Sequence, residues 1–284
     1  MAVRVSAVVP TLGRSPLLIP CLEALRREGM EIVVVDQSEK PVGIPDGLAD
    51  RVLRPGRNLG FAAGTNLGIA EAAGEWIATV NDDAVVEPGW LAALLAALEA
   101  DPRAAAAQGI NLLHDSPERA DGCGLEWNRW WQAVQIGHGK TAPGPEGAAR
   151  EVFGVSATAA VYRRQALLDI GGFDSRLVSY YEDVDLAVRL RAAGWRALLV
   201  PQARARHVGS VTGRTLSRER WRLIYGNRMV VARRFLGGGF WIRLPVLLMR
   251  DAIDLARAVL REDGALAGGI AAGWGRALRF RDNL

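Results

Sequence analysis

The sequence predicts an α/β protein in which a mostly parallel sheet is covered by helices on both faces. Strand-like and helix-like segments alternate over the first 110 residues, the pattern of repeated β–α units. The strand-like segments are continuous apolar runs, as expected for strands that are buried on both faces. Half of the 284 residues are hydrophobic and 23% are charged, which is the composition of a folded chain and excludes a disordered one.

Each predicted element rests on its own local pattern. Apolar, largely β-branched runs predict strands at 3–9, 31–36, 52–53 and 76–80. Apolar residues spaced three and four apart predict helices at 17–27, 62–73 and 90–100. We expect Pro88 to lie in the first turn of the last of these helices, where proline is favoured.

The alternation of strand-like and helix-like segments stops at residues 112–150. They contain several tryptophans and a Gly/Pro-rich section at 137–147, so we expect a long loop or irregular excursion of the kind that often covers a binding site. Regular structure then resumes. The later segments predict a strand within 152–162, helices at 164–170 and 183–193 around a turn at 171–172, and a strand at 197–200.

Beyond Arg218 the chain is predicted to be helical to its end, with breaks at 237–239 and around 264–275. We therefore expect an α/β domain at 1–235 and a helical region at 236–284. In this region arginines interrupt an apolar pattern, which is too charged to span a bilayer but is typical of a helix lying in a membrane interface. The alternatives are a helix that covers the α/β domain and a seam between two copies of the chain.

Cysteine content and charge indicate the cellular compartment and the class of binding partner. Two cysteines form neither a disulfide framework nor a four-ligand zinc site, and the N-terminal residues lack a signal-peptide pattern, so we expect a cytoplasmic protein with Cys21 in its core. The net charge is only +4, but residues 204–234 carry nine arginines against Glu219 alone. This imbalance indicates an anionic partner such as a phosphate or a membrane surface. Nucleic acid is disfavoured because aromatic residues are not interleaved with the arginines.

Acidic residues follow two of the predicted strands. Asp36 ends the second strand, and Asp82 and Asp83 follow the strand at 76–80, so all of them should lie at the carboxyl edge where open parallel sheets bind ligands. The first strand is followed by PTLGR and not by a GxGxxG fingerprint, which argues against a dinucleotide-binding enzyme. Two adjacent carboxylates favour a bound Mg²⁺ or Mn²⁺. The alternative is that one of them caps a helix.

A second acidic cluster precedes the helix at 183–193. It follows two tyrosines, and Glu182 and Asp183 complement the positive end of that helix or, alternatively, supply a general base. His207 stands just past a predicted strand, where it is either a metal ligand or an ordinary packed histidine.

These segments, taken together and in order over residues 3–234, resemble the family 2 glycosyltransferases, enzymes with a GT-A fold. They are most similar to the bacterial branch known as rhamnosyltransferase-like. The segments that carry the resemblance are AVVPTLGR (7–14), VVVDQS (33–38), NLGFAAGTNLG (58–68), VNDDA (80–84), GGFDSRLVSYYEDVDLAVRLRAAGW (171–195) and HVGS (207–210).

The resemblance implies a division of roles among the residues. The nucleoside and donor side would be lined by Pro10, Thr11, Asp36, Asn58, Gly60, Asn66 and Asp82, with Asp82 at the ribose. Asp83 and His207 would hold the metal, Mn²⁺ or Mg²⁺, and Asp183 would deprotonate the acceptor hydroxyl. The acceptor side would include Tyr181, Glu182, Trp130 and Trp131. The glycines of 58–68 either let the chain approach the donor or serve tight helix–strand packing.

The implied activity is inverting, metal-dependent transfer of a sugar from a nucleotide-diphosphate donor in cell-surface polysaccharide synthesis. The expected donor is dTDP-rhamnose, with UDP-hexoses next. The expected acceptor is a saccharide, free or linked to polyprenyl diphosphate, at the inner membrane face. The sequence departs from the family pattern at Gln37 and Asn81, where asparagine and an acid are usual. The alternative is a catalytically silent nucleotide-sugar-binding or assembly module of the same fold.

Overall fold

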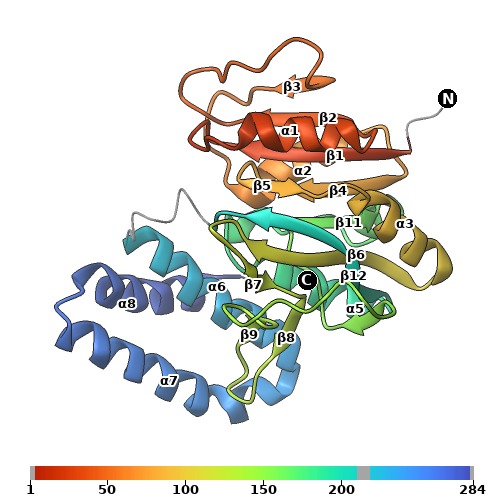
Figure 1. Ribbon diagram of the computed structural model, residues 1–284. Helices are drawn as coiled ribbons and strands as arrows, with labels where there is room; N and C mark the ends of the chain where they lie inside the picture. The colour runs from red at the N-terminus through yellow and green to blue at the C-terminus, as the bar shows by residue number, and fades with distance from the viewer. Residues whose placement is uncertain (1–3, 210–217, 282–284) are drawn as a thin grey trace.

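A computed structural model describes residues 4–209 and 218–281 and shows one central sheet with helices on both faces and a helical layer at one end (Figure 1). Its strands are β1 (Val5–Thr11), β2 (Glu31–Asp36), β3 (Arg51–Leu53), β4 (Trp76–Val80), β5 (Ala84–Val86), β6 (Ala104–Leu113), β7 (Ser116–Gly122), β8 (Leu125–Trp127), β9 (Ala133–Gln135), β10 (Arg150–Val152), β11 (Ala159–Arg163) and β12 (Arg196–His207). Its longer helices are α1 (Leu18–Arg27), α2 (Phe61–Glu71), α3 (Trp90–Ala100), α4 (Arg164–Asp169), α5 (Glu182–Ala192), α6 (Arg218–Leu236), α7 (Phe240–Leu260) and α8 (Gly264–Arg279).

The strand order of the main sheet is β10-β12-β6-β11-β4-β1-β2-β3. β3, β2, β1 and β4 run parallel, and β6 and β12 run parallel to each other, whereas β11 lies antiparallel between β4 and β6. The predicted mostly parallel sheet is therefore confirmed. The chain order reverses between β1 and β4, which is the switch point at which such sheets bind ligands.

Two apolar layers hold the helices on the sheet. One face of β1, β2 and β4 packs against α1 and α3, and the other face packs against α2, α4 and α5. The predicted helices at 17–27, 62–73 and 90–100 are confirmed within one or two residues. Pro88 lies outside its helix, however, because Gly89, with φ +83°, forms the N-cap of α3.

The prediction of an irregular excursion at 112–150 holds for residues 136–149, which contain no helix or strand, but was wrong for the residues before them. β6 extends to Leu113, β7 pairs with it in antiparallel orientation, and β8 and β9 form a separate hairpin. The pairing of β7 has irregular register, and β8 and β9 have three residues each, so neither produces the alternation of apolar residues that reveals a strand in sequence. The strand predicted at 197–200 is likewise longer, and His207 is the last residue of β12 instead of following it.

Three helices form the layer at the end of the sheet opposite β3 (Figure 1). The break predicted at Gly237–Gly239 is a short 3₁₀ turn between α6 and α7, but the break predicted around 264–275 is wrong because α8 runs through it. A Cβ on Gly273 would lie 2.9 Å from the backbone nitrogen of Gly226, and one on Gly269 would lie 2.3 Å from Cβ of Trp221. The glycines therefore allow α8 to cross α6 closely, which outweighs their low helix propensity.

None of the helices in the described part of the chain has the length and apolar composition that crossing a bilayer requires.

Candidate functional site

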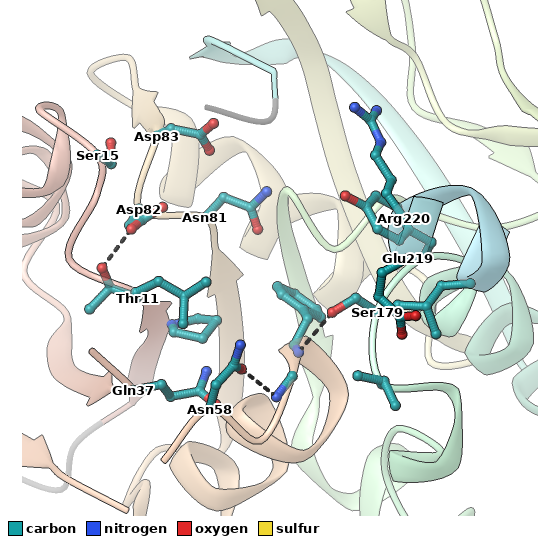
Figure 2. A pocket seen from close by; sticks show the side chains of 17 residues that line it. Thr11, Ser15, Gln37, Asn58, Asn81, Asp82, Asp83, Ser179, Glu219 and Arg220 are labelled. Carbon is teal, nitrogen blue, oxygen red and sulfur yellow. Dashed lines mark hydrogen bonds between the residues drawn. The ribbon is translucent and has the colours of Figure 1, made fainter. Parts of the chain in front are cut away.

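A cavity of about 410 Å³ opens at the carboxyl ends of β1 and β4, where the strand order reverses (Figure 2). Thr11 ends β1, and its hydroxyl donates a hydrogen bond of 2.5 Å to the Asp82 carboxylate beyond β4. Pro10, Thr11 and the triplet 81–83 line this cavity, as the family resemblance implied, and Arg220 at the start of α6 lies across from Thr11. Burial raises the pKa of Asp82 to about 6; the bond from Thr11 opposes this shift and the neighbouring Asp83 charge adds to it.

His207 connects Asp83, which lines this cavity, to Asp121, which together with His207 lines a second, adjoining cavity. Its Nε2 lies 3.1 Å from Oδ1 of Asp83, and its Nδ1 lies 2.9 Å from Oδ2 of Asp121 on β7. Burial alone would lower the pKa of His207, but hydrogen bonds to Asp121 and Asp83 raise it to about 9. Carboxylates that stabilise a proton on the imidazole equally favour a divalent cation beside it. Ser210, the last residue of the HVGS segment, is outside the described residues.

This donor set fits a divalent metal. Carboxylate oxygen and imidazole nitrogen from Asp83 and His207 are suitable ligands for Mn²⁺, and Asp121 on the second imidazole nitrogen is the outer partner that metal-bound histidines usually have. Within residues 4–209 and 218–281, no cluster of three or more His, Cys, Asp and Glu side chains is arranged around one point. The remaining ligands of an ion held here would therefore come from the diphosphate or from water.

Two residues that the resemblance placed at the donor lie beside the cavity and bind other parts of the chain. The Asp36 carboxylate accepts hydrogen bonds from Ser38, from the backbone N–H of Val42 and from Arg54 at 3.2 Å. Burial would raise the pKa of Asp36, but these bonds lower it below its ordinary value. Asn66 joins α2 to the turn before η1 (Ser175–Leu177) through both amide atoms, which bond the backbone of Phe173.

The segment before α2 closes one wall of the cavity. Asn58 and Gly60 line it, and Oδ1 of Asn58 accepts a 2.8 Å bond from the Gly60 N–H. Gln37 lines it too and accepts a 2.8 Å bond from the N–H of Leu59. Gly60 has φ +82°, and a Cβ there would lie 2.7 Å from the carbonyl oxygen of Val178, so only glycine fits.

A second cavity, of about 570 Å³, adjoins the first and contains the second acidic cluster. Tyr181, Glu182 and Asp183 line it at the start of α5. Burial raises the pKa of Asp183 despite hydrogen bonds from Val184, Ala157 and Ser156, and burial together with the Asp183 charge raises that of Glu182 well above its ordinary value. Buried neighbouring carboxyl groups with raised pKa values are suited to general acid–base chemistry.

The loop between the two cavities has unusual backbone geometry. Val178, Tyr180 and Tyr181 all have φ between +67° and +68°, which is uncommon for residues other than glycine and a genuine outlier for a β-branched one. Asn227 of α6, which is fully buried, donates to the carbonyls of Leu177, Ser179 and Tyr180 at 2.8–3.0 Å. Its Oδ1 accepts a 3.0 Å bond from Arg276 of α8. The C-terminal helices therefore fix the loop that lies between the cavities.

Trp130 and Trp131 do not line either cavity. Trp131 packs with the α6–α7 cluster, and the Arg243 guanidinium lies 4.4 Å from its ring centre. Arg129 covers Trp130 at 4.9 Å. Both tryptophans lie in the turn between β8 and β9, and Trp131 is held there by its contacts with the helical layer.

Sequence reasoning missed Asp121, Arg220 and Asn227. Asp121 lies in a strand that the sequence does not reveal, and Asn227 lies in the interior of a helix with no motif around it. Arg220 belongs to the arginine-rich segment, four of whose other members form ion pairs with acids: Arg206 with Glu87, Arg222 with Glu219, Arg228 with Asp251, and Arg234 with Asp174 and Asp185.

Comparison with known proteins gives matches in sequence and in structure. A family model described as glycosyl transferase family 2 matches residues 6–171. The N-acetylglucosaminyl-diphospho-decaprenol L-rhamnosyltransferase of Mycobacterium tuberculosis (strain ATCC 25618 / H37Rv) is 33% identical over 184 residues, and the alignment covers 55% of this chain and 58% of that protein. The pre-mycofactocin glycosyltransferase of the same strain is 30% identical over 210 residues, 72% of this chain and 42% of that one.

Solved structures share the fold at low sequence identity. GalNAc-T7, crystallised with UDP, GalNAc and Mn²⁺, has a TM-score of 0.66 at 16% identity over 82% of this chain and 48% of its own. The mannosyltransferase PcManGT from Pyrobaculum calidifontis, in complex with GDP-Man and Mn²⁺, has a TM-score of 0.55 at 17% identity over 99% and 89% of the two chains. These likenesses confirm the expected GT-A fold.

Proposed function

Because this chain belongs to glycosyl transferase family 2, we propose that it is an active, inverting glycosyltransferase that uses a nucleotide-diphosphate sugar. The observation that carries the proposal is the pair of adjoining cavities. The first has the Asp82–Asp83 carboxylates and Arg220 on its walls, and the second has Asp183. A silent binding module has no need for a buried carboxyl pair in a second cavity next to the donor.

The donor occupies the first cavity in this proposal. Pro10, Thr11 and Gln37 contact the nucleoside, and Asp82 accepts a bond from the ribose. Arg220 lines both cavities, so its guanidinium is placed to bind diphosphate oxygens near the sugar. Asp83 and His207 hold a divalent ion that, when bound, neutralises charge on the departing nucleoside diphosphate.

The acceptor occupies the second cavity. Asp183 takes the proton of the acceptor hydroxyl while that oxygen forms a bond to the anomeric carbon. The bond from this carbon to the diphosphate oxygen breaks on the opposite face, so the configuration inverts. Tyr181 and Glu182 shape the acceptor side, and burial raises the pKa of Asp183, which makes its carboxylate a stronger base than an exposed aspartate.

We propose a rhamnosyl donor and a lipid-diphosphate-linked saccharide acceptor, supported by the printed name of the mycobacterial relative. The chain aligns with 58% of that relative's length, so donor and acceptor are assigned here by similarity alone.

The first experiment is thermal denaturation of the purified protein with dTDP, UDP and GDP, each with Mn²⁺ and with EDTA. A ligand that binds only the folded state raises Tm. We expect one nucleotide to raise Tm only with metal. The absence of a shift with all three would favour the silent-module alternative.

Asp183→Asn then tests the chemistry. The variant should keep the nucleotide-dependent shift in Tm but lose turnover by 10²-fold or more, the range usual for loss of a general base. Turnover at the wild-type rate would remove Asp183 from its proposed role. The matched control is Asp169→Asn, a carboxylate of α4 that lines neither cavity.

A further inference from the structure

The apolar side chains that this protein leaves exposed are concentrated on one helix. Among the described residues, nine large hydrophobic side chains are exposed, and seven of them belong to α7: Trp241, Ile242, Leu248, Met249, Ile253, Val259 and Leu260. Ile242 is 80% exposed and Leu260 is 85% exposed. The two elsewhere, Leu168 and Leu278, are isolated, as single surface hydrophobics commonly are.

These residues form a continuous stripe along α7. Ile242, Met249 and Val259 alternate with smaller exposed residues at 245, 252 and 256 at intervals of three and four, which places this row on one side of the helix. At 100° per residue, the other four of the seven fall on the same half of the helix surface. The opposite side, with Phe240, Leu247 and Ala258, is buried against the rest of the protein. With 21 residues, the helix is roughly 30 Å long at 1.5 Å per residue. Figure 1 shows it at the outer edge of the molecule, away from the sheet.

The charged side chains of α7 are also divided between the two sides of the helix. Asp251 is fully buried, forms an ion pair with Arg228 and accepts a 2.8 Å bond from Trp274. Asp254 accepts a bond from Tyr225 and lies 3.3 Å from Nε of Arg250. Both acids of the helix therefore face inward.

The charged residues on the outer side of the helix are basic. Arg257 is exposed on α7 itself, with 58% of its side chain accessible, and its Nη1 lies 3.7 Å from the mostly buried Asp254. Arg261 is exposed directly after the helix, beside the exposed Glu262. The apolar stripe is therefore flanked by positive charge and lacks an exposed acid of its own.

We propose that this stripe docks on an anionic lipid bilayer, with α7 lying in the plane of the interface. An apolar face with flanking arginines is the arrangement by which interfacial helices bind such membranes. A second copy fits less well, because a two-fold contact between these stripes would bring the Arg257 side chains of both copies to one interface. The nearby acid of α7, Asp254, is already shared by Arg250, Arg257 and the Tyr225 hydroxyl. Lipid phosphates supply the missing negative charge. Docking needs neither donor nor acceptor, so it is tested apart from sugar transfer.

The test is co-sedimentation of the full-length protein with vesicles of phosphatidylcholine alone or with 30% phosphatidylglycerol. We expect binding that increases at least tenfold with the anionic lipid. Ile242→Glu/Met249→Glu should lower the apparent affinity at least tenfold at unchanged Tm, because both side chains are exposed. Leu168→Glu, which replaces an exposed leucine of α4 by the same acid, should bind as the wild type does.

Equal binding of the α7 variant and the wild type would overturn the proposal, as would equal sedimentation with and without vesicles. Sedimentation velocity without lipid tests whether the stripe binds a second copy instead. If the wild type and Leu168→Glu are dimers and Ile242→Glu/Met249→Glu is a monomer, the stripe is a contact between two copies.

Discussion

Asn227 offers the sharpest test of how the helical layer controls the site. Its side-chain amide donates to three backbone carbonyls of the loop at 177–180, those of Leu177, Ser179 and Tyr180, and also accepts from Arg276. Asn227→Leu keeps the branched shape of the side chain, with somewhat larger terminal groups, but removes all four bonds. We expect both lower stability and lower activity from this one substitution.

The size of the stability loss follows from which partners stay buried. Carbonyls of the loop next to the cavities regain water, whereas the bond to the Leu177 carbonyl is fully buried and the Arg276 N–H is partly so. A buried polar group without a partner costs about 1–3 kcal/mol, so the variant should lose about 2–4 kcal/mol of unfolding free energy. That is a large share of the 5–15 kcal/mol typical of a folded domain.

Activity should decline through geometry. Without the amide, the residues with positive φ at Val178, Tyr180 and Tyr181 can relax to lower-energy conformations, each worth on the order of 1–3 kcal/mol. Asp183 lies two residues beyond this loop. A shift near 1 Å costs on the order of 10²-fold in rate, so kcat/KM should drop by roughly 10- to 100-fold.

Urea denaturation measures the first effect, and kcat/KM with the donor identified by thermal shift measures the second. The control is Leu98→Ala, which creates a cavity in α3 far from both cavities and costs about 2–5 kcal/mol. Assayed at a temperature where both variants are folded, Leu98→Ala should retain wild-type kcat/KM. If Asn227→Leu retains it as well, the argument that this amide positions the loop is refuted.

Two further predictions concern acidic residues. Asp121→Asn removes the charge that orients His207, so Mn²⁺ affinity measured by calorimetry should fall 10- to 100-fold. Glu118→Gln, on the same strand, is the control and should leave the affinity unchanged. Undiminished affinity in Asp121→Asn would contradict the orienting role. Asp174→Asn concerns stability against pH. Burial alone would raise the pKa of Asp174, but hydrogen bonds from Arg176 and Arg234 lower it from 3.8 to about 2. The ionised form therefore stabilises the fold by about 2 kcal/mol above pH 4, and this contribution disappears as the pH falls from 4 to 2; a gap between wild type and variant that persists at pH 2 would refute this account.

Much of the donor side was predictable because it depends on the ends of buried strands. Buried parallel strands are read from continuous apolar runs, and parallel strands bring their carboxyl ends to one edge. The resemblance then assigned roles to Thr11, Asp82 and Asp83 at that edge, and the structure brings these side chains together. The same argument does not extend to Asp36, because its carboxylate is used by its own loop and by Arg54.

The residues that sequence reasoning misplaced depend on contacts between distant segments. The resemblance assigned Trp130 and Trp131 to the acceptor side, but they lie in the turn of the β8–β9 hairpin and line neither cavity. Asp121 gave no signal because the register of β7 against β6 is irregular and hides its strand. The glycines of α8 predicted a break, and only their contact with α6 explains why they continue a helix.

By itself the sequence determined the α/β class, the order of the main strands and helices, and the family, because buried periodicity and short motifs are local properties of the chain. The tertiary structure alone decided three other matters: that Asp121 stands behind His207, that Asn227 holds the loop between the cavities, and that one face of α7 is left without a covering. The first two depend on contacts between residues 40 or more positions apart, and the third depends on which surface the rest of the protein leaves exposed. Local sequence patterns predict neither.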